Sequence, residues 1–184
     1  KTLKYQVMIV KNINTPKELI EQLKRVESPF GYFEVLQRMD ITRGAFESYF
    51  TWNEEKYTRN CLARTDEFEL MVMCWEEGQE TRIHDYGEAM AWVNPICGSL
   101  REERYLLSDN GTGLVKVSSL GVGTAEFSFL HTTGIHKYIN EYESRSVSLH
   151  LYVKPVKSRK IYDCSDGFCK TWSEECVDDS VCIV

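Results

Sequence analysis

The sequence predicts a mainly β domain of the α+β class, an antiparallel barrel or sandwich preceded by short helices. Three observations lead to this prediction. The 184 residues are 42% apolar and 27% charged, the balance of a globular chain with one substantial core. Helical periodicity is confined to the part before Trp52. After Trp52, short runs rich in β-branched and aromatic residues alternate with glycine-containing breaks.

The helical part is predicted to begin at Thr15-Pro16-Lys17-Glu18. This string offers a capping hydroxyl, a proline at the first helical position and a glutamate three residues after the cap. An apolar face follows at three- and four-residue spacing, made of Leu19, Ile20, Leu23 and Val26. We expect two further helical stretches, at Tyr32–Met39 and Thr42–Tyr49.

The strand-rich part contains six runs of strand composition, separated by turn-forming sequences. These runs are Tyr57–Ala63, Phe68–Trp75, Ala89–Leu107, Leu114–Val117, Thr124–His131 and Val147–Val153. Many short strands at such spacing predict an antiparallel barrel or sandwich. We expect one domain over residues 1–184, with helices at about 15–52, a barrel at about 53–162 and a C-terminal tail at about 163–184.

The charge of the chain excludes two classes of partner. Twenty-two Lys and Arg against 28 Asp and Glu give a net charge of −6, which repels phosphate backbones and anionic membranes. The densest basic run, Lys154–Lys160, is short and has the composition of a solvated turn. No apolar run approaches the roughly 20 residues of a membrane-spanning helix. We therefore expect a soluble protein with no nucleic-acid and no membrane partner.

The seven cysteines indicate a reducing compartment. Cys61, Cys74 and Cys97 fall in apolar, strand-like segments, where a reduced thiol behaves as a small hydrophobe. The four later cysteines lack the C-x-x-C spacing of a zinc ribbon, so we expect no structural zinc there. These four are Cys164, Cys169, Cys176 and Cys182. The expected protein is a cytoplasmic monomer.

The four histidines all lie in the strand-rich part, at positions 84, 131, 136 and 150. Period-2 alternation places His84, Tyr86 and Glu88 on one face of an extended strand, and all three carry donor atoms. Such alternation is equally typical of the solvated face of a sheet. Taken alone, it leaves both a metal site and a solvated face open.

Several longer strings, read in order, resemble the cysteine dioxygenase family of thiol dioxygenases. The strings are Tyr57–Asn60, Leu70–Trp75, Ile83–Asp85, Gly134–His136 and Ser146–Tyr152. The resemblance runs from about residue 15 to residue 155. It implies a cupin, a small antiparallel β-barrel or jelly roll with N-terminal helices, that binds one non-haem Fe2+. Such enzymes add both atoms of O2 to the thiol of cysteine and produce the sulfinic acid.

The resemblance also implies roles for individual residues. Arg59 matches the arginine that binds the substrate carboxylate, and Tyr57 matches a tyrosine beside it. A planar guanidinium that stays charged is suited to this task. His84 and His136 match two of the three iron-binding histidines, and neutral imidazole suits ferrous iron. A catalytic relay is implied for Ser148, His150 and Tyr152, in which the histidine holds the tyrosine hydroxyl toward the substrate.

The sequence departs from the family pattern at the second iron-ligand position, which is Tyr86. A phenol has a pKa near 10 and binds iron well only when ionised, and a tyrosinate favours Fe(III) over Fe(II). Three outcomes are open: His84 and His136 bind iron alone or with Glu88, Tyr86 is the third metal ligand, or no iron binds. Ala91 replaces the cysteine that can form a thioether with the relay tyrosine.

The functional prediction is an iron-dependent dioxygenase of cysteine or a similar small carboxylated thiol, with the thiol and O2 as its small-molecule partners. Two alternatives follow from Tyr86. One is a catalytically altered or inactive cupin that binds a small thiol or amino acid. The other is a cupin oxygenase whose substrate has changed.

Overall fold

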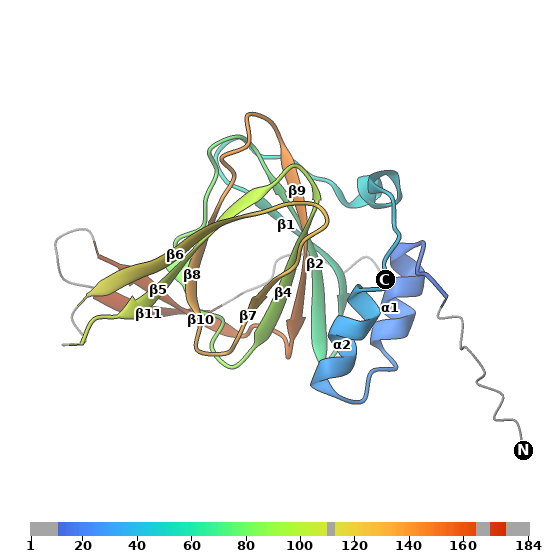
Figure 1. Cartoon of the computed structure of the whole chain (residues 1–184), viewed down its shortest axis with the longest axis horizontal. Helices are drawn as coiled ribbons and strands as arrows, with labels where there is room; N and C mark the ends of the chain where they lie inside the picture. Colours follow the sequence, from blue (N-terminus) through green and yellow to red (C-terminus); the bar gives the residue numbers. More distant parts are fainter. Residues whose placement is uncertain (1–10, 110–112, 165–169, 176–184) are drawn as a thin grey trace, which may run out of the picture. The chain divides into compact units, whose positions relative to one another are not determined.

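A computed structural model describes residues 11–109, 113–164 and 170–175. The chain divides into two compact units, residues 1–46 and residues 47–184. The first carries two short helices, α1 (Pro16–Leu23) and α2 (Pro29–Leu36), and the second carries the strands (Figure 1). The helical stretch predicted at Thr42–Tyr49 is a 3-10 helix, η1 (Arg43–Tyr49), which spans the boundary.

The predicted start of α1 is confirmed. The backbone N–H of Glu18 donates to Thr15 Oγ1 at 3.1 Å, and Pro16 occupies the first helical position. The Glu18 carboxylate accepts from the backbone N–H of Asn14 at 2.9 Å, one residue before the cap. The second helix begins three residues earlier than predicted, because Pro29 takes its first position.

The strands of the second unit form two antiparallel sheets. The five-stranded sheet has the order β1-β2-β9-β4-β7, with β1 Thr58–Arg64, β2 Phe68–Trp75, β9 Ser146–Val153, β4 Met90–Cys97 and β7 Ser128–Leu130. The six-stranded sheet has the order β11-β10-β3-β8-β5-β6, with β11 Lys170–Glu175, β10 Ser158–Asp163, β3 Ile83–His84, β8 Ile135–Ile139, β5 Leu100–Leu107 and β6 Leu114–Val122. The predicted mainly β, antiparallel class is confirmed.

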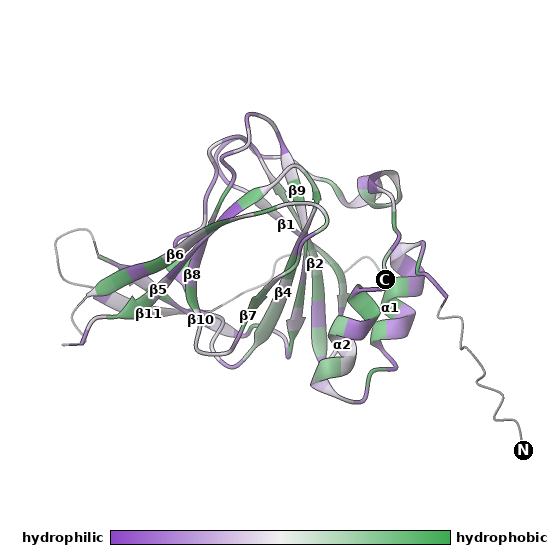
Figure 2. Ribbon diagram, viewed as in Figure 1, coloured by the Kyte–Doolittle hydropathy of each residue, from purple (hydrophilic) through white to green (hydrophobic). Residues whose placement is uncertain are grey.

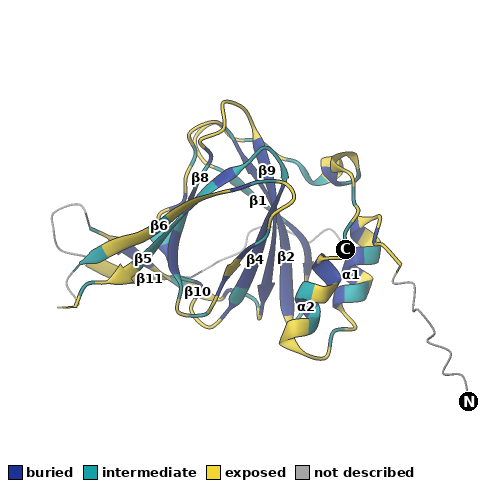
Figure 3. Cartoon of the chain, viewed as in Figure 1, coloured by how far each residue is buried: buried dark blue, intermediate teal, exposed yellow. Residues whose placement is uncertain are grey.

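The core of the second unit lies between these sheets. Every residue of β2 and β9 is buried, and both strands are rich in hydrophobic residues (Figures 2 and 3). Side chains that alternate along β2, namely Met71, Met73 and Trp75, meet Tyr138 and Tyr152 in one buried cluster. In the barrel interior, apolar side chains therefore pack around buried aromatic and polar side chains.

The predicted run Ala89–Leu107 is two strands, β4 and β5. Gly98 separates them with φ +71°, and a Cβ at this position would lie 2.2 Å from Ser146 Oγ. The six predicted runs do not include β3, β8, β10 or β11. Residues 170–175, which we expected in a tail, pair with β10 as β11. The remainder of that predicted tail after residue 175 lies outside the described residues.

The expectation that Cys61 is a reduced thiol is wrong. Cys61 and Cys164 are both disulfide-bonded, whereas Cys74 and Cys97 are free. Structural disulfides persist in oxidising compartments and are rare in reducing ones, so these disulfide-bonded cysteines weigh against the reducing compartment that we predicted. In the described parts of the chain, no helix has the length and apolar character needed to cross a membrane.

Candidate metal centre and substrate cavity

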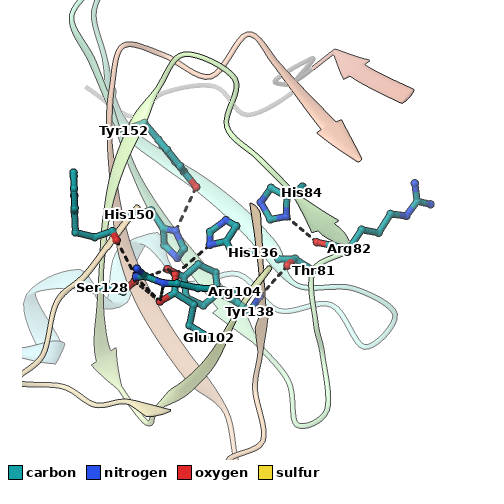
Figure 4. Close-up of polar contacts among 11 residues, drawn as sticks. Thr81, Arg82, His84, Glu102, Arg104, Ser128, His136, Tyr138, His150 and Tyr152 are labelled. Carbon is teal, nitrogen blue, oxygen red and sulfur yellow. Dashed lines mark hydrogen bonds and ion pairs between the residues drawn. The ribbon is translucent and has the colours of Figure 1, made fainter. Parts of the chain in front are cut away.

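Two histidines on neighbouring strands form the centre of the site. His84 on β3 and His136 on β8 are direct cross-strand partners, and their ring centroids lie 4.7 Å apart. Both side chains are buried, with 2% and 0% of their surface exposed. The antiparallel pairing of β3 with β8 therefore brings together two residues that are far apart in sequence (Figure 4).

His136 has one ring nitrogen engaged and one without a partner. Its Nδ1 donates to Glu102 Oε1 at 3.2 Å. Its Nε2 is the buried side-chain N or O atom that has no hydrogen-bond partner in the described part of the chain. Burial lowers the pKa of His136 in spite of the opposing effect of Glu102, which keeps the imidazole neutral. The lone pair therefore sits on Nε2, as a metal ligand requires.

The same arrangement holds at His84. Its Nδ1 lies 2.7 Å from the backbone carbonyl oxygen of Arg82. A carbonyl can only accept, so Nδ1 carries the proton and Nε2 carries the lone pair. Burial, and then the neighbouring His136, lowers the pKa of His84 well below its ordinary value. Both rings are thus neutral and in the tautomer that binds a metal through Nε2.

A buried carboxylate on β5, Glu102, fixes the orientation of His136. Besides His136, its oxygens accept from Arg104 at 2.8 Å, Ser128 at 2.7 Å and Tyr138 at 3.2 Å. Burial alone would raise the pKa of Glu102, but the hydrogen bonds from His136, Arg104 and Ser128 outweigh it and lower the pKa to about 2. Sequence reasoning missed Glu102, because a charged strand such as β5 has the pattern of a solvent-exposed strand.

Tyr86 packs against both histidines. Its ring centroid lies 5.0 Å from that of His84 and 4.7 Å from that of His136, and only 6% of its surface is exposed. Its ring also meets that of Tyr152 edge-on, with centroids 4.9 Å apart. Burial, and then the neighbouring tyrosines, raises the pKa of Tyr86 well above its ordinary value, so the phenol is neutral.

The structure separates Glu88 from this cluster, contrary to the predicted alternation. The strand ends at His84, and Gly87 has φ +59°, so the chain turns and Glu88 is exposed. Within residues 11–109, 113–164 and 170–175, no group of three His, Cys, Asp or Glu side chains could hold a metal ion. Tyr86 carries a further donor atom, and its ring contacts both imidazoles.

The two imidazoles are spaced as two ligands of one divalent metal ion would be. With a metal–nitrogen bond of about 2.1 Å, two imidazoles bound at a right angle have ring centroids about 4.5 Å apart. The observed separation of His84 and His136 is 4.7 Å, and the unpartnered Nε2 of His136 is an atom that a metal would satisfy. A neutral phenol at the third position is the weakest member of the set.

A chain of hydrogen bonds leads to a tyrosine hydroxyl on β9. Trp75 Nε1 donates to Ser148 Oγ at 2.9 Å, and Ser148 Oγ lies 2.8 Å from His150 Nε2. His150 Nδ1 lies 3.3 Å from the Tyr152 hydroxyl (Figure 4). Burial lowers the pKa of His150 and raises the pKa of Tyr152. Both groups are neutral, and the histidine positions the tyrosine hydroxyl.

The chain of hydrogen bonds gives a stability prediction. Ser148→Ala leaves the buried Trp75 N–H without its acceptor, so we expect the free energy of unfolding to fall by about 1–3 kcal/mol. Ser118→Ala, at a partly exposed position of β6, should change it by less than about 0.5 kcal/mol. Urea unfolding of the two variants and the parent protein measures both changes. Equal effects of the two substitutions would contradict this account.

One cavity joins these groups to the predicted substrate-binding residues. The space inside it is small, about 10 Å³ for the centre of a water-sized sphere. Arg59 and Tyr57, at the start of the five-stranded sheet, line it together with His84, Tyr86, His150 and Tyr152. The Tyr57 ring stacks on Trp75 with centroids 4.5 Å apart. A second arginine, Arg159 of β10, also lines the cavity, and sequence reasoning did not identify it.

Two facing antiparallel sheets with buried polar side chains gathered in the barrel interior define this protein as a cupin. Comparison with protein families matches residues 14–165 to cysteine dioxygenase type I. The chain therefore belongs to the cysteine dioxygenase family of thiol dioxygenases. The match covers the chain as a whole and does not test individual residues, so the roles of the eight predicted site residues stay predictions.

Two curated relatives and one solved structure illustrate the similarity. Cysteine dioxygenase type 1 of Homo sapiens is 26% identical over 164 residues, covering 83% of this chain and 82% of the relative. The Rattus norvegicus protein of the same name is 25% identical with the same coverage. The structure of TT1209 from Thermus thermophilus has a TM-score of 0.51 and 13% identity, over 59% of this chain and 93% of the other. This last likeness concerns the fold alone.

Proposed function

We propose that this protein is an iron-dependent dioxygenase that converts a small thiol carrying a carboxylate into its sulfinic acid, with cysteine as the first candidate substrate. One observation carries the proposal. Two neutral imidazoles with free Nε2 lone pairs lie in direct contact beside a cavity that also contains an arginine and a positioned tyrosine hydroxyl. Family membership supports the same reaction class.

Arg59 is the group proposed to bind the substrate carboxylate. Its guanidinium offers a planar pair of donors and stays charged when it is partly buried. Its charge acts on the site: after burial it is the next cause that lowers the pKa of His150, and it opposes part of the rise that burial causes in the pKa of Tyr152. Tyr57 lines the cavity beside it, held by its stack on Trp75. These residues would orient the thiol end of the substrate toward the histidines.

His84 and His136 are the residues proposed to hold iron, with Tyr86 as the third neighbour. Ferrous iron, when bound, would bring the substrate thiolate and O2 together and supply the electrons that activate O2. Glu102 keeps the Nδ1 proton on His136 and so keeps Nε2 available. Tyr152, held by His150, would donate a hydrogen bond to the reacting groups from the cavity wall.

A second candidate function is a cupin that binds the thiol without oxidising it, and the observation that favours it is Tyr86. The phenol is neutral, buried against both imidazoles and in ring contact with Tyr152. In this state it packs on the two histidines without offering a strong donor. Oxidation would then require the phenol to ionise on metal binding or to move away.

One experiment separates the two functions. The purified protein is loaded with one equivalent of ferrous iron without oxygen, and O2 consumption and sulfinate formation are then followed with cysteine present. The dioxygenase predicts one O2 consumed per sulfinate formed. Iron-loaded protein that produces no sulfinate, while metal-free protein binds cysteine in a calorimeter, would overturn the proposal in favour of the binding protein.

The role of Arg59 gives a kinetic prediction. Arg59→Gln removes a charged donor from the substrate carboxylate, so we expect KM for a carboxylated thiol to rise by about 10–100-fold with a smaller change in kcat. Lys56→Gln, which removes the same charge at an exposed position three residues earlier, should leave both constants within about twofold. Steady-state O2 consumption measures both. A KM unchanged in Arg59→Gln would contradict the role.

A further inference from the structure

The cavity at the candidate site is too small for an organic ligand as it stands. The space open to the centre of a water-sized sphere, about 10 Å³, is roughly what one water molecule needs. Even the smallest carboxylated thiol is several times larger than a water molecule. A side chain of the cavity wall must therefore move before such a ligand can bind.

A second and much larger space borders Tyr86, and we call it the outer pocket. It opens about 450 Å³ to the centre of the same water-sized sphere. Its lining comes from residues 86–89, after β3, and from the segment 154–158 between β9 and β10. Of the described residues that line the cavity, Tyr86 is the one that also lines the outer pocket. The Tyr86 side chain therefore stands between the two spaces.

Hydrogen bonds hold the backbone on both sides of Tyr86. The carboxylate of Asp85 accepts from the backbone N–H groups of Gly87 and Lys160, each at 3.0 Å. The backbone N–H of Ala89 donates to the carbonyl of Tyr86 at 3.1 Å and closes a turn. Because the backbone is fixed in this way, rotation of the side chain is the motion that can open the wall.

The ring of Tyr86 meets its aromatic neighbours edge-on and has free space beside it. The interplanar angles are 72° with His84, 82° with His136 and 76° with Tyr152. Edge-to-face contacts of this kind are individually weak. The outer pocket is large enough to receive a phenol ring, and Ser158 in its wall is exposed. A turn of the ring into the outer pocket would join the two spaces.

The outer pocket carries an excess of positive charge, although the whole chain has a net charge of −6. Two lysines, Lys154 and Lys157, line it together with one acid, Glu88. Lys154 has φ +65°, a left-handed conformation that glycine adopts without strain and lysine does not. Backbone strain of this kind gathers at functional sites. A local positive charge attracts a small anion to the pocket.

We propose that the outer pocket is the entrance to the cavity for a small anionic ligand and that the Tyr86 side chain closes the passage between them. The ring turns into the outer pocket to admit the ligand. The inference takes from the proposed function only the nature of this ligand, a carboxylated thiol. The passage itself rests on the two spaces and on the wall that they share.

Chemical modification of a cysteine placed in the cavity measures this passage without metal, O2 or substrate. Met73→Cys puts the reporter on the buried strand β2, in the cavity lining. The reagent is 2-sulfonatoethyl methanethiosulfonate, a small anion that forms a mixed disulfide with the reporter. Mass spectrometry follows the reaction, and the protein without the reporter gives the background from its own cysteines. Val156→Cys, also in the cavity lining, is the second reporter if the first variant does not fold.

Substitutions on the two sides of the wall should have opposite effects. In the reporter protein, we expect Tyr86→Ala to raise the modification rate at least about tenfold, because it removes the ring from the passage. Ser158→Phe fills part of the outer pocket and should lower the rate at least about threefold. Ser119→Phe makes the same change at an exposed position of β6 that lines neither space, and should alter the rate by less than about twofold.

The charge of the entrance is tested with two reagents of opposite sign. Replacing Lys154 and Lys157 together by Gln should slow the anionic reagent about threefold at low salt. The same change should not slow the cationic 2-trimethylammonioethyl reagent. Lys160→Gln removes one charge from an exposed position of the same basic run that lines neither space, and should leave both rates within about twofold.

The outcomes separate this inference from the proposed function. A modification rate unchanged in Tyr86→Ala, or unchanged in Ser158→Phe as entry on the side of Arg59 predicts, would overturn the inference even if iron-loaded protein oxidises cysteine. Passage that depends on Tyr86 in a protein that oxidises no thiol would uphold the inference and sink the dioxygenase. Thermal unfolding of each variant, measured alongside, identifies a change in rate that is due to misfolding.

Discussion

Tyr86→His is expected to raise the affinity for ferrous iron by about 10–100-fold and to increase the rate of thiol oxidation with it. The substitution replaces a neutral phenol, whose pKa is raised well above its ordinary value by burial, with an imidazole that binds iron without first losing a proton. The position already packs against both His84 and His136. Anaerobic iron titration and sulfinate formation measure the two gains.

The control for this experiment is Tyr86→Phe, which keeps the ring and removes the hydroxyl. If Tyr86 serves as a metal ligand, Tyr86→Phe should lose iron and any visible absorption band of an iron–tyrosinate pair. If Tyr86 only packs against the histidines, Tyr86→Phe should keep the iron affinity of the parent within about threefold. A Tyr86→His variant that binds iron no better than Tyr86→Phe would show that the position does not face the metal.

Glu102→Gln is expected to lower the free energy of unfolding by about 3 kcal/mol and the iron affinity by about 10–100-fold. The carboxylate accepts from His136, Arg104, Ser128 and Tyr138, whereas an amide that accepts from Arg104 turns its N–H toward His136 Nδ1. His136 would then adopt the other tautomer and protonate Nε2. Urea unfolding and anaerobic iron titration measure the two losses.

The comparison variant is Glu103→Gln on the same strand. Glu103 pairs with the exposed Lys116 and has no contact with His136, so its substitution should cost about 1 kcal/mol or less and leave iron binding unchanged. If Glu102→Gln retained the parent's iron affinity, the claim that this carboxylate sets the tautomer of His136 would be wrong.

The pH dependence of stability gives an independent signature of Glu102. Its pKa is about 2 when folded against an ordinary value of 4.5, so its contribution is complete above about pH 5. The contribution, about 3 kcal/mol for such a shift, is lost as the pH falls from about 4.5 toward 2. The difference in unfolding free energy between the parent and Glu102→Gln should therefore be constant near neutrality and shrink over that range.

The helices and strands that could be predicted are those that form through residues close together in the sequence. The start of α1 could be predicted because Thr15, Pro16 and Glu18 act within one turn. The central strand β2 could be predicted because it is buried on both faces and hence continuously apolar. The two-residue strand β3 and the polar strand β10 lack such a signal, since tertiary pairing alone makes them strands.

The residues of the candidate site also differ in whether the local sequence identifies them. Arg59, His84, His136 and Tyr152 stand in strings long enough to carry a family resemblance, and the structure places Arg59, His84 and Tyr152 on one cavity with His136 in contact with His84. Glu102 and Arg159 lie on charged strands, where inward and outward charges have the same sequence pattern. Only the strand register distinguishes them.

Anaerobic titration of metal-free protein with ferrous iron tests the central claim, which is that His84 and His136 hold one metal ion between them. We predict saturation at one equivalent in the parent protein and loss of saturable binding in both His84→Ala and His136→Ala, with the exposed His131→Ala unchanged. Absence of saturable binding in the parent, or binding that survives either of the first two substitutions undiminished, would contradict the account.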